Sequence, residues 1–104
     1  MSEERRRTPR YPFFASAELY EEQSDVRVVS RVSELGLYGC YLDMMNPFPP
    51  NTVIRLKITA GDLIFESKAR VVYSTPNMGS GVMFLDVEPK FQYIVERWID
   101  EVQK

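Results

Sequence analysis

Apolar and polar side chains alternate with a period of two along most of this chain, and turn residues interrupt the alternation at short intervals. Strict alternation places one face of a strand in a core and the other face in solvent. The clearest case is the segment 52–59, in which Ile54, Leu56 and Ile58 alternate with polar residues. The pattern therefore predicts a domain built mainly from antiparallel strands.

Six strands are predicted in this way, at residues 13–20, 25–32, 40–42, 52–59, 63–74 and 81–87. In the long segment 63–74 we expect Tyr73 to lie on the same face as Phe65 and Val71. Three prolines within residues 46–51 remove three backbone donors, which indicates a rigid connection outside the sheet. Six antiparallel strands joined by short turns favour a small barrel or a closed sheet.

A change of period marks the C-terminal segment. Its apolar residues fall at spacings of three and four, which is typical of an amphipathic helix. They are Phe91, Ile94, Val95, Trp98, Ile99 and Val102. Pro89 suits the first turn of a helix, where its missing N–H is not needed. We therefore expect a helix over residues 88–103 that covers one open end or face of the barrel. The chain is predicted to comprise an arm at residues 1–12 and the barrel with its helix at residues 13–104.

The composition argues against several classes of function. The chain contains no histidine and a single cysteine, so the usual general base is missing and no internal disulfide can form. Cys40 lies in an apolar run and is expected to be a buried structural thiol rather than a nucleophile. We therefore expect no catalytic residues, no metal site and no enzymatic activity.

Targeting signals are not visible in the sequence either. No apolar run is long enough for a membrane span, and no charged-then-apolar start with a cleavage site is present. A single cysteine agrees with a reducing compartment. These features predict a cytoplasmic protein without a membrane span.

The charge of the chain is distributed unevenly. The first ten residues hold four arginines against two glutamates, a balance of +2, whereas the other 94 residues hold nine basic and thirteen acidic groups, a balance of −4. The four are Arg5, Arg6, Arg7 and Arg10. Pro9 keeps this arm extended, and a guanidinium fork matches phosphate oxygens or the O6 and N7 edge of guanine. The arm is therefore either a solvated terminus or a clamp for a small guanine nucleotide.

Residues 6–10, with the sequence Arg-Arg-Thr-Pro-Arg, resemble the Arg-x-x-x-Arg motif of PilZ domains, which are bacterial receptors for the second messenger cyclic di-GMP. The order of arm, six strands and helix is similar to that family as well, and residues 81–85 resemble its last strand. The resemblance implies a six-stranded antiparallel PilZ-type barrel with one C-terminal helix. It also implies that Arg6 and Arg10 hold the nucleotide, with Arg5 or Arg7 supplementing them.

The second motif of the family, Asp/Asn-x-Ser-x-x-Gly, is altered in this chain. In one register, residues 31–36, the serine and the glycine are kept and an arginine replaces the acid. In the other register, residues 34–39, the glycine is kept, a glutamate replaces the acid and the serine is lost. The flanking residues 39–43 and 46–50 resemble those that follow the motif in many members, which favours the second register.

In the second register the resemblance implies that Glu34, Gly36 and Gly39 form the other wall of the nucleotide site. The acid of the family accepts hydrogen bonds from the donor edge of guanine, and Glu34 can do so with a shifted backbone or another rotamer. The missing hydroxyl at Gly36 costs about 0.5–1.5 kcal/mol of binding free energy. The charge-assisted contacts of Arg6 and Arg10 should dominate that loss.

These observations predict a non-enzymatic cyclic di-GMP receptor whose arm orders over the barrel on binding and is read by an unidentified downstream effector protein. Cyclic di-GMP is the expected ligand, and no cofactor is expected. The alternative is a degenerate PilZ domain that binds no nucleotide and acts as a protein adaptor. Nucleic-acid binding is not expected, because the thirteen acids outside the arm would repel a polyanion.

Overall fold

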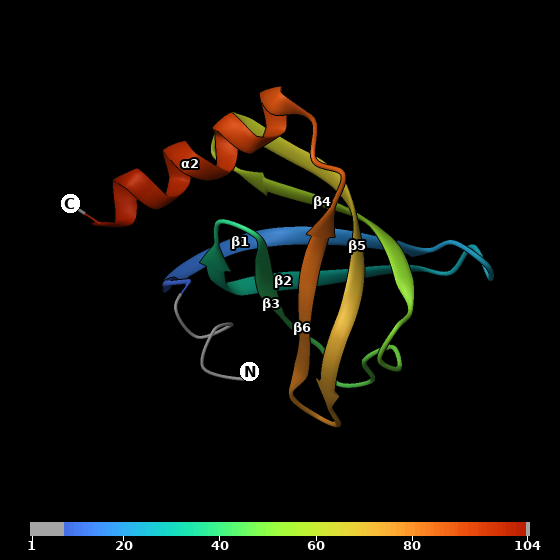
Figure 1. Ribbon diagram of the computed structural model, residues 1–104. Coiled ribbons are helices and arrows are strands. Elements are labelled where there is room, and N and C mark those ends of the chain that lie inside the picture. Colours follow the sequence, from blue (N-terminus) through green and yellow to red (C-terminus); the bar gives the residue numbers. More distant parts are fainter. Residues whose placement is uncertain (1–7, 104) are drawn as a thin grey trace.

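The computed structural model describes residues 8–103, and within them six antiparallel strands close into one barrel (Figure 1). The strands are β1 (Arg10–Glu21), β2 (Arg27–Gly36), β3 (Gly39–Asp43), β4 (Val53–Ala60), β5 (Leu63–Thr75) and β6 (Gly79–Leu85). Around the barrel they run in the order β1-β2-β3-β6-β5-β4, and β4 pairs back with β1. The predicted mainly-β class and six-stranded barrel are confirmed.

One helix, α2 (Pro89–Gln103), follows the barrel and lies across one of its ends (Figure 1). The backbone carbonyl of Glu88 accepts hydrogen bonds from the N–H groups of Phe91 and Gln92. The first turn of the helix therefore forms around Pro89. Its apolar side packs on β5, β1 and β2. The predicted helix is therefore confirmed to within one residue. In the described part of the chain, no helix has the length and apolarity needed to cross a membrane.

The core lies inside the barrel and under α2. Inward-facing side chains of the strands are nearly inaccessible, among them the predicted set Ile54, Leu56 and Ile58. Trp98 of α2 stacks on Phe13 with the ring centroids 5.1 Å apart, which closes the end of the barrel that α2 covers. The strands enclose the core from the sides, and the helix covers the end that they leave open.

β1 and β2 extend beyond their predicted bounds because the pairing continues through a bulge, and β6 spans Gly79–Leu85 rather than residues 81–87. β1 begins at Arg10 rather than at residue 13, and its register against β2 shifts between Pro12 and Ala15. β2 runs on to Gly36, with a shift between Val32 and Glu34. A bulge adds one residue to one strand without ending the ladder, so simple alternation cannot reveal it.

The predicted orientation of Tyr73 is wrong for the same reason. Phe65 and Val71 are buried as expected, but 46% of Tyr73 is exposed. The register against β6 shifts between Val71 and Tyr73, which adds one residue to β5 at this point. The extra residue reverses the alternation, so Tyr73 stands on the outer face of the barrel.

The closure of the barrel end by α2 yields a stability prediction. Trp98→Ala removes a buried ring and should lower the free energy of unfolding by about 3–5 kcal/mol. Tyr93 on the same helix is 59% exposed, so Tyr93→Ala should change stability by no more than about 0.5 kcal/mol. Urea denaturation measures both. Equal effects of the two substitutions would mean that α2 contributes little to the core.

Candidate functional site

The described residues of the predicted site come together on one outer face of the barrel. Arg10 pairs with Gly36 across β1 and β2, and Glu34 lies between Pro12 of β1 and Tyr41 of β3. Gly39 begins β3, directly after the turn that follows Gly36. The structure therefore places all four described members of the predicted set at one corner of the barrel.

Three further members of the predicted set, Arg5, Arg6 and Arg7, lie outside the described residues. Arg10 is exposed at the first position of β1. Gln103 of α2 donates a hydrogen bond of 2.6 Å to the hydroxyl of Tyr11. A cavity of about 370 Å³ lies between this part of β1 and α2. The arm therefore joins the barrel beside both the candidate site and the helix.

A bulge turns Glu34 outward. Val32 and Leu35 are both fully buried although three positions separate them. The register shift between Val32 and Glu34 takes up the additional residue. Ser33 and Glu34 therefore both lie on the outer side, beside Tyr41. Glu34 is exposed, and its carboxylate is accessible to a ligand over this face.

Glycines leave much of this face without side chains. Four of the five glycines of the chain lie on its strands β2, β3 and β6, at positions 36, 39, 79 and 81. A Cβ atom on Gly39 would lie 2.2 Å from the carbonyl oxygen of Val82, and one on Gly81 would lie 2.3 Å from the ring of Tyr73. Only glycine permits these approaches, so β3 packs closely on β6 and the ring of Tyr73 lies directly over Gly81.

Two tyrosines lie on this face and were not part of the predicted site. Tyr41 of β3 and Tyr73 of β5 both pair with Gly81, and their ring centroids are 6.2 Å apart. Burial raises the pKa of Tyr41, and Tyr73, Asp43 and Glu34 raise it further. Aromatic faces of this kind can stack on a nucleotide base. Only the strand register brings the two rings together, so the linear sequence gave no signal for them.

Cys40 lies beneath the candidate site, and its thiol is poorly reactive. Burial raises the pKa of its thiol to about 12, and the positive charge of Arg10 opposes that shift. The side chain is fully buried, as predicted. Among residues 8–103 no cluster of three or more acidic or cysteine side chains is arranged to hold a metal ion.

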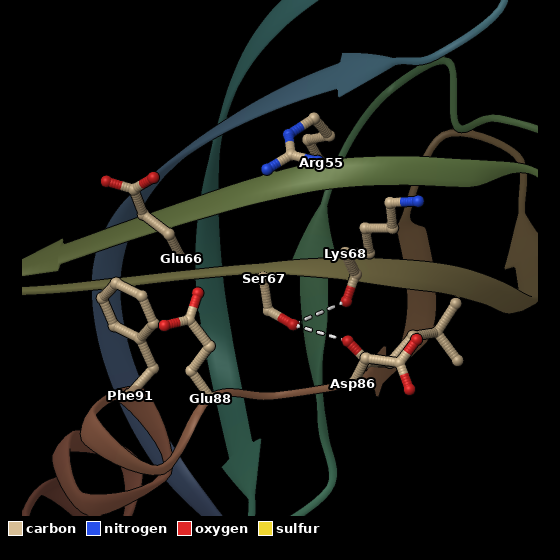
Figure 2. Close-up of a pocket in the computed structure, with 8 residues that line it drawn as sticks. Arg55, Glu66, Ser67, Lys68, Asp86, Glu88 and Phe91 are labelled. Atoms are coloured by element: carbon tan, nitrogen blue, oxygen red, sulfur yellow. Dashed lines mark hydrogen bonds between the residues drawn. The ribbon is translucent and has the colours of Figure 1, made fainter.

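A hollow of about 220 Å³ lies elsewhere, between β4, β5 and the start of α2 (Figure 2). It is lined by Arg55, Glu66, Ser67, Lys68, Leu85, Asp86, Glu88 and Phe91. The hydroxyl of Ser67 already donates to the carbonyl oxygens of Lys68 and Leu85, at 2.9 and 3.0 Å. Three carboxylates against two cations make this hollow unfavourable for an anion.

The chain was compared with known families and structures. The family model described as PilZ domain matches residues 4–101. The fold is similar to the PilZ domain with c-di-GMP of YcgR from Escherichia coli, with a TM-score of 0.76 and 15% identity over 95% of this chain and 92% of that one. It is also similar to the PilZ domain of CeSA from a cellulose synthesizing bacterium, with a TM-score of 0.72 and 16% identity over 93% and 100%. No curated protein matches the chain significantly.

The raised pKa of Cys40 predicts a loss of stability in alkaline solution. Its thiol ionises near pH 9 in the unfolded chain and near pH 12 in the folded protein. Above about pH 9 the unfolded state therefore releases a proton that the folded state keeps, and folding becomes less favourable as the pH rises.

Urea denaturation of the wild type and of Cys40→Ala measures this effect. From about pH 9 to about pH 10 the wild type should lose about 1 kcal/mol more unfolding free energy than Cys40→Ala loses. The constant cost of the smaller side chain cancels in this comparison. Parallel pH profiles for the two proteins would contradict the assignment.

Proposed function

We propose, from the premise that this chain belongs to the PilZ domain family, that it is a non-enzymatic receptor for cyclic di-GMP. The observation that supports the proposal is the pairing of Arg10 with Gly36 across β1 and β2, two residues along from the pairing of Pro12 with the exposed Glu34. A receptor of this kind binds its ligand by positioned charges and stacking surfaces, and it needs no catalytic group. The similar PilZ domain of YcgR, a structure with c-di-GMP, supports the choice of ligand.

The arginines of the arm supply the attraction for the two phosphates. In this proposal Arg6 and Arg10 clamp the phosphates and guanines, and Arg5 or Arg7 supplements them. Guanidinium groups form paired, charge-assisted hydrogen bonds with phosphate oxygens and with the O6 and N7 edge of guanine. The exposed position of Arg10 at the start of β1 leaves its donors accessible for such bonds.

Glu34, Gly36 and Gly39 form the opposite wall. The carboxylate of Glu34 accepts hydrogen bonds from the donor edge of a guanine, while the two glycines keep the neighbouring backbone closely packed behind it. The hydroxyl that is missing at Gly36 costs about 0.5–1.5 kcal/mol. Stacking of one base on Tyr73 contributes about 1–3 kcal/mol. The aromatic surface therefore offsets the altered motif.

Ligand binding would fix the arm over the barrel, and this ordered arm is the signal that a downstream effector protein reads. The hydrogen bond between Tyr11 and Gln103 links the root of the arm to the end of α2. A change in the position of the arm therefore reaches the exposed side of the helix. Such a change from a free to an ordered segment is a common form of molecular switch.

A protein adaptor that binds no nucleotide is the second candidate. It is favoured by Gly36, where the family motif has a serine. The spacing of Arg6 and Arg10 argues against it, because an adaptor has no need for two arginines placed four residues apart. Binding of cyclic di-GMP to the purified protein separates the two candidates directly.

Titration calorimetry with cyclic di-GMP tests the proposal. The wild type should bind at ligand concentrations below about 100 micromolar. Replacing both Arg6 and Arg10 by alanine removes the charge-assisted contacts and should weaken binding about 100-fold. Arg97→Ala, an exposed arginine of α2 that pairs with Glu101, is the control and should bind normally. Absence of heat for the wild type would favour the adaptor.

The contribution of the aromatic surface can be measured separately. Tyr73→Ala removes the ring and should weaken binding of cyclic di-GMP about tenfold, whereas Tyr73→Phe keeps the stacking face and should bind within about twofold of the wild type. Tyr93→Ala serves as the control, because Tyr93 is an exposed tyrosine of α2. Equal binding by Tyr73→Ala and the wild type would exclude stacking on this residue.

A further inference from the structure

Besides Arg10, the described part of the outer face carries Arg31, which is held in place by a carboxylate. The Nε and Nη2 atoms of Arg31 donate to one oxygen of Asp43 at 3.3 and 3.2 Å. The other oxygen of Asp43 accepts a hydrogen bond of 2.9 Å from Ser33. Ser30 donates to the backbone carbonyl of Asp43 at 2.6 Å. Asp43 is thus fixed from three sides, and it fixes Arg31.

Arg31 keeps free donors despite this pairing. A guanidinium has five N–H donors, and two of them point to Asp43. The remaining three include one on each terminal nitrogen, which together form a fork at the end of the side chain. The side chain of Arg31 is 65% exposed, whereas that of Asp43 is 34% exposed. The fork is therefore available to a ligand.

The strand pairing puts Arg31 on the outer face of β2, on the far side of Glu34 from Arg10. Arg31 pairs with Asp43 across β2 and β3, and Asp43 pairs with Gly79 of β6. The inward-facing row of Val32, Leu42 and Ser80 separates this row from the one that contains Glu34 and Tyr41. Arg31 stands five residues before Gly36 on β2, or roughly 16 Å along the strand. Arg10 and Arg31 therefore lie toward opposite ends of one face.

The pairing also decides which part of a nucleotide Arg31 suits. The carboxylate of Asp43 neutralises the guanidinium, so the pair offers directed donors without a net positive charge. A neutral base edge gains from such donors, whereas a phosphate would also meet the repulsion of Asp43. Guanine offers two acceptors, O6 and N7, at the spacing of the fork. The geometry therefore fits a guanine edge.

We propose that Arg31 reads the O6 and N7 edge of one guanine of the bound dinucleotide, with Asp43 and Ser33 as positioning residues. This inference rests on the proposed function and adds a specificity-determining residue to it. In this proposal different residues bind different parts of the ligand. The arm holds the phosphates by charge, and Arg31 recognises a base by the direction of its hydrogen-bond donors.

Calorimetry with cyclic di-GMP on four single variants tests the inference. Arg31→Ala should weaken binding about tenfold, because a good bidentate contact is lost. Arg31→Lys should weaken it as much, because lysine keeps the charge and lacks the fork. Asp43→Asn should weaken binding about threefold. Arg27→Ala should bind like the wild type, because Arg27 lies on the same strand but pairs with Glu18 at 3.2 Å.

A double variant separates positioning from direct contact. If Asp43 acts through Arg31, adding Asp43→Asn to Arg31→Ala should cause no further loss of affinity. Wild-type binding by Arg31→Lys would show that only the charge matters and would overturn the guanine contact. Wild-type binding by Arg31→Ala would exclude any contact. Failure of the wild type itself to bind cyclic di-GMP would instead refute the proposed function.

Discussion

The double pairing of β1 determines the rest of the structure. From Ser16 to Tyr20 this strand is hydrogen-bonded to β2 on one side and to β4 on the other, which closes the barrel. From Arg10 to Ala15 it pairs with β2 alone, and α2 packs beside it through Trp98 and Phe13. The first part of β1 is therefore the point where the arm, the helix and the outer face of β2 meet. A ligand held at this point touches all three.

Alternation predicted the number of strands and most of the buried side chains well, because burial of one face is what stabilises each strand. It failed at the bulges. An additional residue in one strand changes neither composition nor hydropathy, but it reverses the orientation of every residue beyond it. Tyr73 was assigned to the core for this reason. The bulge beside Glu34 also has a structural effect on the candidate site. It lets Val32 and Leu35 stay buried while the carboxylate of Glu34 faces outward.

The candidate site was predictable only in part. Arg10, Glu34, Gly36 and Gly39 are close to one another along two neighbouring strands and their turn, so a linear motif can indicate them. Tyr41 and Tyr73 are 32 positions apart in the chain and meet only because β3, β6 and β5 lie side by side. The sequence did not indicate Arg31 either, because its proposed role depends on Asp43, which lies opposite it on the neighbouring strand. Contacts across a sheet carry no signature in a single sequence.

An acidic protein can nevertheless attract a small dianion. At physiological salt the interaction between exposed charges decays over about 8 Å, so a ligand on the outer face of β2 and β3 responds mainly to the charges next to it. Arg10 and Arg31 lie on that face together with Glu34 and Asp43, while Glu66, Asp86 and Glu88 line a separate hollow. A long polyanion would extend beyond the arm and meet those acids. For the proposed receptor, the uneven distribution of charge would favour a small dianion over a long polyanion.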